Sequence, residues 1–307
     1  MAYADEIEKI QAGEIVYPIT CEVDPSWNCN LNCFFCTDNG IVNDGKGLLD
    51  FSIFSMLIAE LSILGTKSIT FTGGGEPLVN PEFNNMVELA HSKGFELGLI
   101  TNGVLLNKVE HPEWFKFIRI SLDSYDRDSY IRVKGMDFFN IVVENIQALT
   151  QRQVTDVGVS YIVCIENQIG IKLAQDLAGF LGVDYIQFKP MVTKGNRKNI
   201  SFEGFSGEKS IVTERYNAED HLPCQIAGLI GVVGADANVY FCCQHRGDKH
   251  FVLGNLEKST FKEIWKNRIN LFPKVSFCKV CRYQNYARGF AKFSKPKFKF
   301  LRHTNFL

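Results

Sequence analysis

The sequence lacks the features that mark membrane-bound, secreted or nucleic-acid-binding proteins. Its 33 basic and 34 acidic residues leave a net charge of −1, so no field of one sign attracts nucleic acid or anionic lipid. The longest weakly polar stretch, Ile226–Ala235, is too short to span a bilayer. The segment Met1–Gln11 carries acids and no apolar core, which predicts no signal peptide. These absences predict a cytoplasmic protein that binds neither membrane nor nucleic acid.

Cysteine is the residue that the sequence has in unusual number. The chain has 307 residues, 46% hydrophobic and 22% charged, which is the composition of a globular protein. Reducing thiols keep disulfides rare in the cytoplasm, so ten cysteines indicate metal or redox chemistry. Eight of the ten fall in two clusters, at residues 29–36 and 224–281, and only Cys21 and Cys164 lie outside them.

Short apolar runs alternate with amphipathic segments between residues 19 and 190. Helix signals include Asp50 and Gly65 at the two ends of one segment and Asn167 as the N-cap of another. The repeated βα units predict a parallel sheet, and six strands predict an incomplete TIM-like (β/α)6 barrel, open along one side. The runs are too short for helices and rich in Ile, Val and Phe, as buried parallel strands are: Ile19–Val23, Ser68–Thr72, Phe95–Thr101, Phe117–Leu122, Val157–Val163 and Tyr185–Lys189.

The rest of the sequence predicts smaller segments around this core. Apolar Leu229–Val233, a turn and Val239–Phe241 predict a β-hairpin, and a short helix is expected over Phe261–Arg268. A unit of this size is too small to be stable through its core alone, and metal ligation is the usual remedy. The expected division is an N-terminal extension at 1–18, the barrel core at 19–190, a polar connection at 191–222, the small module at 223–285 and a basic aromatic tail at 286–307.

Cys29, Cys33 and Cys36 form a C-x3-C-x2-C loop directly after the first predicted strand. Structural iron–sulfur clusters normally use four cysteines, so three thiolates predict a [4Fe–4S] cluster with one iron open to a ligand. Such an iron is able to chelate the amino and carboxylate groups of a methionine moiety. The alternative is three structural cysteines, or a zinc site that takes its fourth ligand from a distant residue.

This loop, with Phe35 before its last cysteine, resembles that of the radical S-adenosylmethionine (SAM) superfamily. The segment Thr72–Pro77, TGGGEP, is similar to that family's GGEP motif, which binds the methionine amino group; Glu76 is able to accept a hydrogen bond from an ammonium. The resemblance implies reductive cleavage of SAM to a 5′-deoxyadenosyl radical. For the strand-end residues, a role in a turn or cap is the alternative. The cofactor-binding residues that the resemblance implies are Phe35, Gly74, Gly75, Glu76, Pro77, Thr101, Asn102, Ser121, Asp123, Arg132 and Asn167.

The second cysteine cluster brackets the predicted hairpin and helix. It resembles the shortened SPASM module called the twitch domain, which carries one auxiliary [4Fe–4S] cluster. Zinc, with Cys243 or His245 as a substitute ligand, is the alternative. Cys243 is left over, and is expected to be either a packed thiol or a hydrogen-atom donor to a substrate radical, with Cys164 as the rival donor. The auxiliary ligands that the resemblance implies are Cys224, Cys242, Cys278 and Cys281.

A radical core with one auxiliary cluster suits hydrogen abstraction from a C–H bond. By family analogy, we expect the oxidation or epimerisation of a carbohydrate-like small molecule, with flavodoxin or ferredoxin as the reductant. Peptide modification is the second expectation, although the 28 residues before Cys29 are too few for the recognition domain that many peptide-modifying relatives carry. A non-catalytic iron–sulfur or zinc protein is the expectation from another class.

Overall fold

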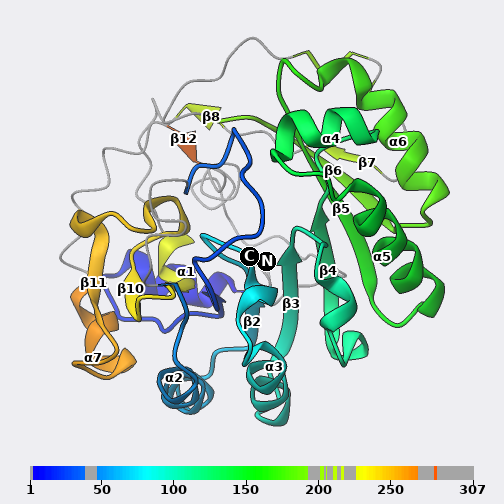
Figure 1. Ribbon diagram of the computed structural model, residues 1–307. Helices are drawn as coiled ribbons and strands as arrows, with labels where there is room; N and C mark the ends of the chain where they lie inside the picture. Colours follow the sequence, from blue (N-terminus) through cyan, green and yellow to red (C-terminus); the bar gives the residue numbers. More distant parts are fainter. Residues whose placement is uncertain are drawn as a thin grey trace.

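The computed structural model (Figure 1) describes residues 3–38, 47–192, 201–203, 205, 210–212, 216–217, 226–268 and 280–281. One long sheet contains the strands β1 (Thr20–Val23), β2 (Ser68–Phe71), β3 (Glu96–Thr101), β4 (Phe115–Ser121), β5 (Asp156–Val163), β6 (Tyr185–Pro190), β7 (Ser210–Val212), β9 (Ile230–Val233), β10 (Asn238–Tyr240) and β11 (Val252–Asn255). A separate pair joins β8 (Tyr216–Asn217) to β12 (Val280–Cys281).

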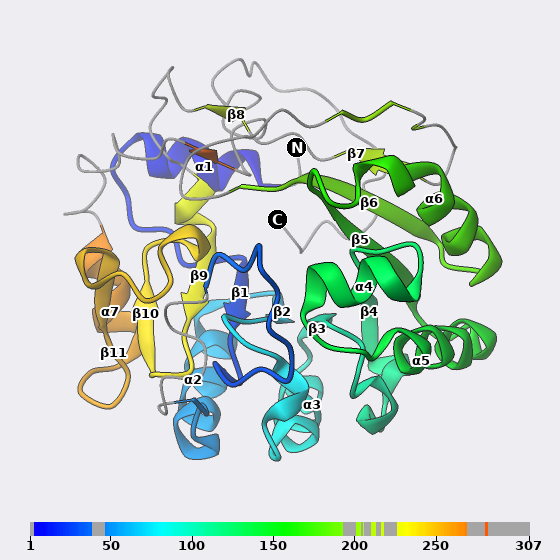
Figure 2. The ribbon, with the colours of Figure 1, turned by 45° about the horizontal axis from the view of Figure 1, so that its top comes forward.

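The sheet has ten strands in the order β11-β10-β9-β1-β2-β3-β4-β5-β6-β7. All neighbours from β9 to β7 are parallel, whereas β10 and β11 are antiparallel at one edge. Figure 2 shows this sheet curved, with helices on its outer side. The helices are α1 (Ala4–Gln11), α2 (Phe51–Leu64), α3 (Phe83–Ser92), α4 (Arg127–Lys134), α5 (Phe139–Arg152), α6 (Ile171–Phe180) and α7 (Phe261–Lys266). The predicted incomplete barrel is therefore confirmed, and β7 and β9 extend its parallel sheet beyond six strands.

Local signals in the sequence account for several helix ends. The side chain of Asp50 accepts hydrogen bonds from the backbone of Ser52 and Ile53 at the start of α2, and Gly65 ends that helix at φ 85°. Asn167 does not cap α6, because that helix begins four residues later, at Ile171, and has Gly170 as its N-cap. Helices α1 and α4 were not predicted. For α4, the capping box that Asp126 and Ser129 form at its start is a signal in the sequence.

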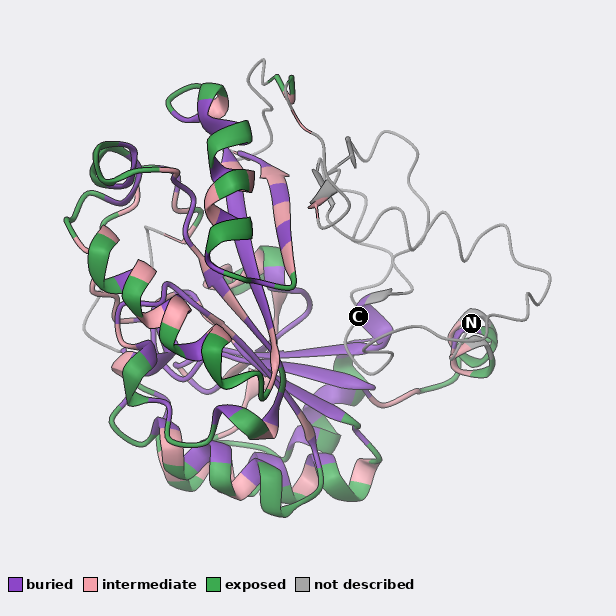
Figure 3. Ribbon diagram, turned by 90° about the vertical axis from the view of Figure 1, so that its right-hand side faces the viewer, coloured by how far each residue is buried: buried purple, intermediate pink, exposed green. Residues whose placement is uncertain are grey.

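The hydrophobic core lies on the helix side of the strands. Figure 3 shows buried strands and helices whose outer faces are exposed. On β1, Cys21 and Val23 are fully buried in this core, which is why Cys21 is a packing residue. None of the described helices has the length and apolar character needed to cross a bilayer. The cytoplasmic location stays a prediction.

The C-terminal hairpin is part of the barrel sheet and has no separate core. The predicted hairpin is confirmed as β9 and β10, and β9 pairs in parallel with β1. Helix α7 packs beside α2, where Lys262 N donates to Glu60 at 3.0 Å, and Trp265 Nε1 donates to Val16 O at 2.8 Å. The apolar side chains of this module belong to the same buried cluster as those of the barrel. The module is therefore stabilised by the barrel, in addition to any metal that it binds.

A buried arginine links the module to the first strand. Arg246 is 7% exposed; its Nη2 lies 2.6 Å from Glu22 Oε2 and its Nε lies 2.9 Å from Asp24 Oδ2. Trp27 Nε1 also donates to Asp24, at 3.2 Å. These contacts assign Asp24 to the framework of the fold, since its carboxylate is fully buried and is hydrogen-bonded to both neighbours.

Asp24 should make the stability of the metal-free protein depend on pH. Burial raises the pKa of Asp24 to about 6, although Arg246 and Trp27 act to lower it. Because this folded-state pKa exceeds the unfolded value, the folded state binds the proton more tightly, and the contribution to stability falls as the pH rises from about 4 to about 6. Urea unfolding measures the free energy of unfolding of wild type and of Asp24→Asn. The value for wild type minus that for the variant should decrease by about 3 kcal/mol as the pH rises across this window. A difference that stays flat with pH would contradict the burial of an ionisable Asp24.

Candidate active site

The cysteine loop, residues 29–36, is held between the end of β1 and the end of α4. The backbone N–H groups of Asn32 and Phe34 donate to the carbonyls of Lys134 and Val133, at 3.1 and 3.3 Å. Gly135 follows at φ 72°, and a Cβ there would lie 2.6 Å from Asn32 O. Only glycine combines this left-handed backbone with so close an approach. The loop conformation therefore depends on α4, an element that the sequence analysis had missed.

The glycine-rich loop after β2 is attached to the same region. Gly75 N donates to Ser26 O at 3.2 Å, and Glu76 N donates to Asn28 O at 2.9 Å. A Cβ on Gly75 would lie 2.4 Å from Asn28 O. The structure thus gives Gly75 a further reason to be glycine, which is the close packing of two loops.

A cavity of about 240 Å³ opens between these loops at the carboxyl ends of the strands. Barrel enzymes build their active sites at this end. Phe35 from the cysteine loop, Asp38 just after that loop, Lys134 from α4 and Met191 after β6 all contribute to its wall. It brings together most of the residues that the sequence singles out, namely Cys29, Cys33, Phe35, Cys36, Gly74, Gly75, Glu76, Thr101, Asn102, Ser121 and Asp123.

The three thiols of the loop are half-buried and line this one cavity. Burial raises the pKa of each of them, to about 11 for Cys29, so binding of iron must release protons. Within the described residues, no three His, Cys, Asp or Glu side chains gather as a single metal ion requires. A [4Fe–4S] cluster does not require the three thiolates to converge on one metal ion, because each thiolate binds a different iron. The donor set therefore fits a cluster better than a zinc ion.

Glu76 is buried at the cavity wall and is held by three donors. Its Oε1 accepts from Thr101 Oγ1 at 2.6 Å and from Leu78 N at 3.2 Å, and its Oε2 accepts from Asn102 N at 2.7 Å. Burial raises the pKa of Glu76, while these hydrogen bonds act to lower it. A carboxylate offers about four acceptor positions, so Oε2 retains one for an amine in the cavity.

Asp123 and Lys134 form a buried ion pair that also lines the cavity. Lys134 Nζ lies 2.5 Å from Asp123 Oδ2, and both side chains are at most 2% exposed. Asp123 Oδ1 also accepts from Ile162 N at 2.6 Å. Burial acts to lower the pKa of Lys134, but Asp123 and Cys33 outweigh it and raise that pKa above its usual value. The ammonium is therefore charged, and it retains donors for a carboxylate in the cavity.

Three predicted cofactor-binding residues lie outside the cavity wall. Arg132 is exposed on α4, and Lys134, two residues later, supplies the cation of the wall instead. Asn167 is fully buried, with its amide donating to Asp123 O and Ile162 O and its Oδ1 accepting from Cys164 N. Pro77 is buried at the start of a short 3-10 helix. Periodicity would have separated Arg132 from Lys134 only if α4 had been recognised, because two residues along a helix face different directions.

The described residues cover only part of the second cysteine cluster. Cys242 and Cys243 are both buried and lie at the turn that leads to Arg246, whose Nη1 donates to Cys243 O at 3.1 Å. Cys281 pairs through its backbone with Tyr216 in β12 and β8. Cys224 and Cys278 lie outside the described residues, as do the tail at 286–307 and most of 191–222.

Cys164 is buried at the end of β5, outside the cavity wall. It belongs to a small apolar cluster with Phe35, Val133 and Met191. Burial raises the pKa of its thiol to about 12. Phe35 and Met191 line the cavity, so Cys164 lies directly behind its wall.

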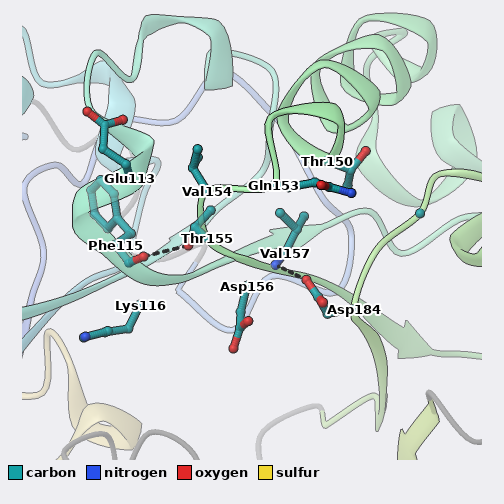
Figure 4. Close-up of a pocket in the computed structure, with 11 residues that line it drawn as sticks. Glu113, Phe115, Lys116, Thr150, Gln153, Val154, Thr155, Asp156, Val157 and Asp184 are labelled. Atoms are coloured by element: carbon teal, nitrogen blue, oxygen red, sulfur yellow. Dashed lines mark hydrogen bonds between the residues drawn. The ribbon is translucent and has the colours of Figure 1, made fainter.

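A second hollow, of about 650 Å³, lies at the opposite ends of β4 and β5 (Figure 4). Figure 4 shows Thr155 and Asp184 engaged with backbone groups: Thr155 Oγ1 donates to Phe115 O at 2.7 Å, and Asp184 Oδ2 accepts from Val157 N at 2.8 Å. No cysteine and no predicted site residue lines it. Polar residues at this end of a barrel usually serve stability, so the smaller cavity is the candidate active site.

Comparisons with known proteins identify two family matches in this chain. Residues 25–170 match the radical SAM superfamily, and residues 224–283 match SPASM, an iron–sulfur cluster-binding domain. The chain is 26% identical over 253 residues to the "Probable GTP 3′,8-cyclase" of Saccharolobus solfataricus, across 76% of this chain and 80% of the relative. It is also 26% identical over 263 residues to the protein of the same name from Sulfolobus acidocaldarius, across 76% of this chain and 83% of that relative.

Solved structures share the fold. Native anSMEcpe with bound SAM has a TM-score of 0.67 at 19% identity, covering 89% of this chain and 88% of that chain. Streptococcus suis SuiB bound to SAM has a TM-score of 0.66 at 12% identity, covering 85% of this chain and 68% of that chain. At these identities, the likeness establishes the arrangement of the elements.

Replacing Lys134 should destabilise the protein far more than replacing another cation of α4. Lys134→Met leaves Asp123 buried without its partner, which should lower the free energy of unfolding by roughly 3–5 kcal/mol. Arg127→Met is the matched control, because the ion pair of Arg127 with Asp137 is exposed and should contribute less than about 1 kcal/mol. Urea unfolding of the two metal-free variants measures both values. Equal losses in the free energy of unfolding would show that the buried ion pair stabilises the protein no more than the exposed one.

Proposed function

Because the chain is a radical SAM protein with a C-terminal SPASM domain, we propose that Cys29, Cys33 and Cys36 hold the SAM-binding [4Fe–4S] cluster of an enzyme that abstracts hydrogen from a C–H bond. When bound, the cluster supplies the electron that cleaves SAM into methionine and a 5′-deoxyadenosyl radical. Flavodoxin or ferredoxin is the proposed source of that electron. The substrate that we propose first is a carbohydrate-like small molecule, which is oxidised or epimerised.

One observation carries the proposal. Three half-buried thiols line a single cavity, and no fourth cysteine lines it within the described part of the chain. Four thiolates complete a structural cluster, so three leave one iron able to take an exchangeable ligand. A purely structural role would not call for a cavity beside the thiols.

The other residues of the wall fit the charged groups of the methionine moiety. Glu76 offers a carboxylate acceptor for the amine, and Lys134 offers donors for the carboxylate. Both side chains are held by other contacts before SAM arrives, so little ordering is required on binding. Asn102 joins this arrangement to the cysteine loop, since its Nδ2 donates to Asn30 Oδ1 at 2.7 Å. We propose Lys134 for the carboxylate in place of Arg132.

The polar wall and the relatives favour a small molecule as substrate. Thr37, Asp38, Thr72 and Ser121 line the cavity with hydroxyl and carboxyl groups, which suit a molecule with several hydroxyls. The relatives reported above are named as cyclases of GTP, itself a small molecule with a ribose. Oxidation would pass the substrate's second electron to the auxiliary cluster, whereas epimerisation would return a hydrogen atom from a thiol.

Peptide modification is the second candidate. The fold is shared with SuiB bound to its precursor peptide SuiA and with anSMEcpe bound to the Cp18Cys peptide. These structures support only the compatibility of this fold with a peptide substrate.

Metal content and SAM cleavage test the proposal against a non-catalytic role. Anaerobically reconstituted protein should contain about eight irons per chain, and with dithionite it should form 5′-deoxyadenosine from SAM. Cys33→Ala should abolish 5′-deoxyadenosine formation, whereas Cys21→Ala, in the core, should retain it. A content of about four irons and one zinc per chain would indicate a zinc site in place of the auxiliary cluster. Failure of the reconstituted wild type to cleave SAM would refute the enzymatic role.

The thiol that would donate hydrogen in an epimerisation is also testable. Both candidates are buried, and Cys243 is the first choice because it lies next to Cys242, a predicted ligand of the auxiliary cluster. With a panel of sugars and aminocyclitols in D₂O, wild type should place deuterium in the product. Cys243→Ala should lose this label while still forming 5′-deoxyadenosine, and Cys164→Ala tests the rival donor. If neither variant changes the product, then no thiol takes part in the reaction.

A further inference from the structure

Tyr130 places an unsatisfied hydroxyl inside the protein. Its side chain is fully buried, and its Oη has no hydrogen-bond partner among the described residues. More than nine in ten buried polar groups in proteins are hydrogen-bonded, because an unpaired one loses its contacts with water without replacement. The hydroxyl therefore requires an explanation that packing alone does not provide.

The position of Tyr130 relates this hydroxyl to the cysteine loop. Tyr130 and Lys134 are four residues apart on α4 and so share one face of the helix. Lys134 Nζ lies in the cavity wall, 5.5 Å from the ring centroid of Phe35. The carbonyls at the end of α4 bind the backbone of the cysteine loop at Asn32 and Phe34. The end of the helix that carries Tyr130 is thus attached to the loop that carries Cys33, and the next residue along its face, Lys134, reaches the cavity.

The electrostatics of Tyr130 agree with this placement. Burial is the largest cause that raises the pKa of Tyr130, and a charge on Cys33 raises it further, whereas Lys134 lowers it. A phenolic O–H is a hydrogen-bond donor, and the sulfur of a cysteine that has lost its proton to bind iron is an acceptor.

Resting on the proposed function, we infer that Tyr130 is a positioning residue of the SAM-binding cluster, whose hydroxyl donates a hydrogen bond to the Cys33 thiolate once iron is bound. Hydrogen bonds to cluster sulfurs raise the reduction potential, because they stabilise the more negative, reduced form. Tyr130 would therefore make the cluster easier to reduce, and Lys134, the buried cation on the same helix face, acts in the same direction.

The role of the Tyr130 hydroxyl can be tested separately from that of its ring. The ring packs edge-on against Phe139, with centroids 5.9 Å apart, and phenylalanine would preserve that contact. Tyr240→Phe is the matched control, since Tyr240 is equally buried but its hydroxyl already donates to Asp236 Oδ2 at 2.7 Å.

A redox titration of the cluster-loaded protein tests the inference. The electron paramagnetic resonance signal that responds to added SAM identifies the relevant cluster. In Tyr130→Phe, the equilibrium constant for its reduction should fall about tenfold, which corresponds to a midpoint potential about 59 mV more negative. Tyr240→Phe should leave this midpoint unchanged. An unchanged midpoint in Tyr130→Phe overturns the inference, while the proposed function stands as long as wild type binds the cluster and cleaves SAM.

Thermal unfolding of the metal-free protein provides a second readout. Before iron binds, the Tyr130 hydroxyl has no partner in the described part of the chain, so Tyr130→Phe should leave the melting temperature unchanged or raise it. Tyr240→Phe should lower it, because that change removes one of the hydrogen bonds that the Asp236 carboxylate accepts. A lower melting temperature of metal-free Tyr130→Phe would show that the hydroxyl already has a partner within the protein, and would overturn the inference.

Discussion

The buried ion pair between Asp123 and Lys134 is the interaction on which the candidate active site depends. Asp123 lies just past β4 in a left-handed conformation, φ 57°, with its carbonyl bound by Asn167 and its carboxylate bound by Ile162 N and Lys134. One carboxylate therefore joins β4, β5 and α4. Since α4 in turn holds the cysteine loop, the three thiols depend on this pair for their position. The ion pair preserves this arrangement, because the loss of either partner would leave the other charge buried and unpaired, which is strongly unfavourable.

The first cysteine cluster and the described part of the second, Cys242 and Cys243, are parts of one framework. Strand β1 leads directly to Cys29, and the same strand pairs with β9 of the C-terminal module. Arg246 adds an electrostatic link, because it binds the Cys243 carbonyl, the carboxylate of Glu22 in β1 and that of Asp24 just after β1. A mixed sheet with a shared apolar core makes the module an extension of the barrel. We therefore expect the geometry between the two cysteine regions to be rigid.

The chemistry of the site follows from where the polar groups lie, and not from the size of the hollow. The larger hollow, at the opposite ends of the strands, has no cysteine among its lining residues, and the ion pair that Glu113 of its wall forms with Arg152 is exposed. The smaller cavity combines three thiols, a carboxylate held by three donors and a buried ammonium. These groups complement a cluster with an amino acid bound to it. The role that we propose for Tyr130 would add a hydrogen bond to the same group of thiolates.

The sequence by itself determined the six core strands, the cap and end of α2, the hairpin and the location of the three thiols. Such features depend on neighbouring residues, because apolar periodicity, capping and ligand spacing act over a few positions. Only the tertiary structure decided that Lys134 and not Arg132 reaches the cavity, that Asn167 binds Asp123 and that Arg246 pairs with Glu22 and Asp24. These contacts join residues up to 224 positions apart. No local sequence pattern predicts which helix face or strand end such a residue will contact. Burial makes such distant polar partners obligatory, and only the folded chain shows which ones are within reach.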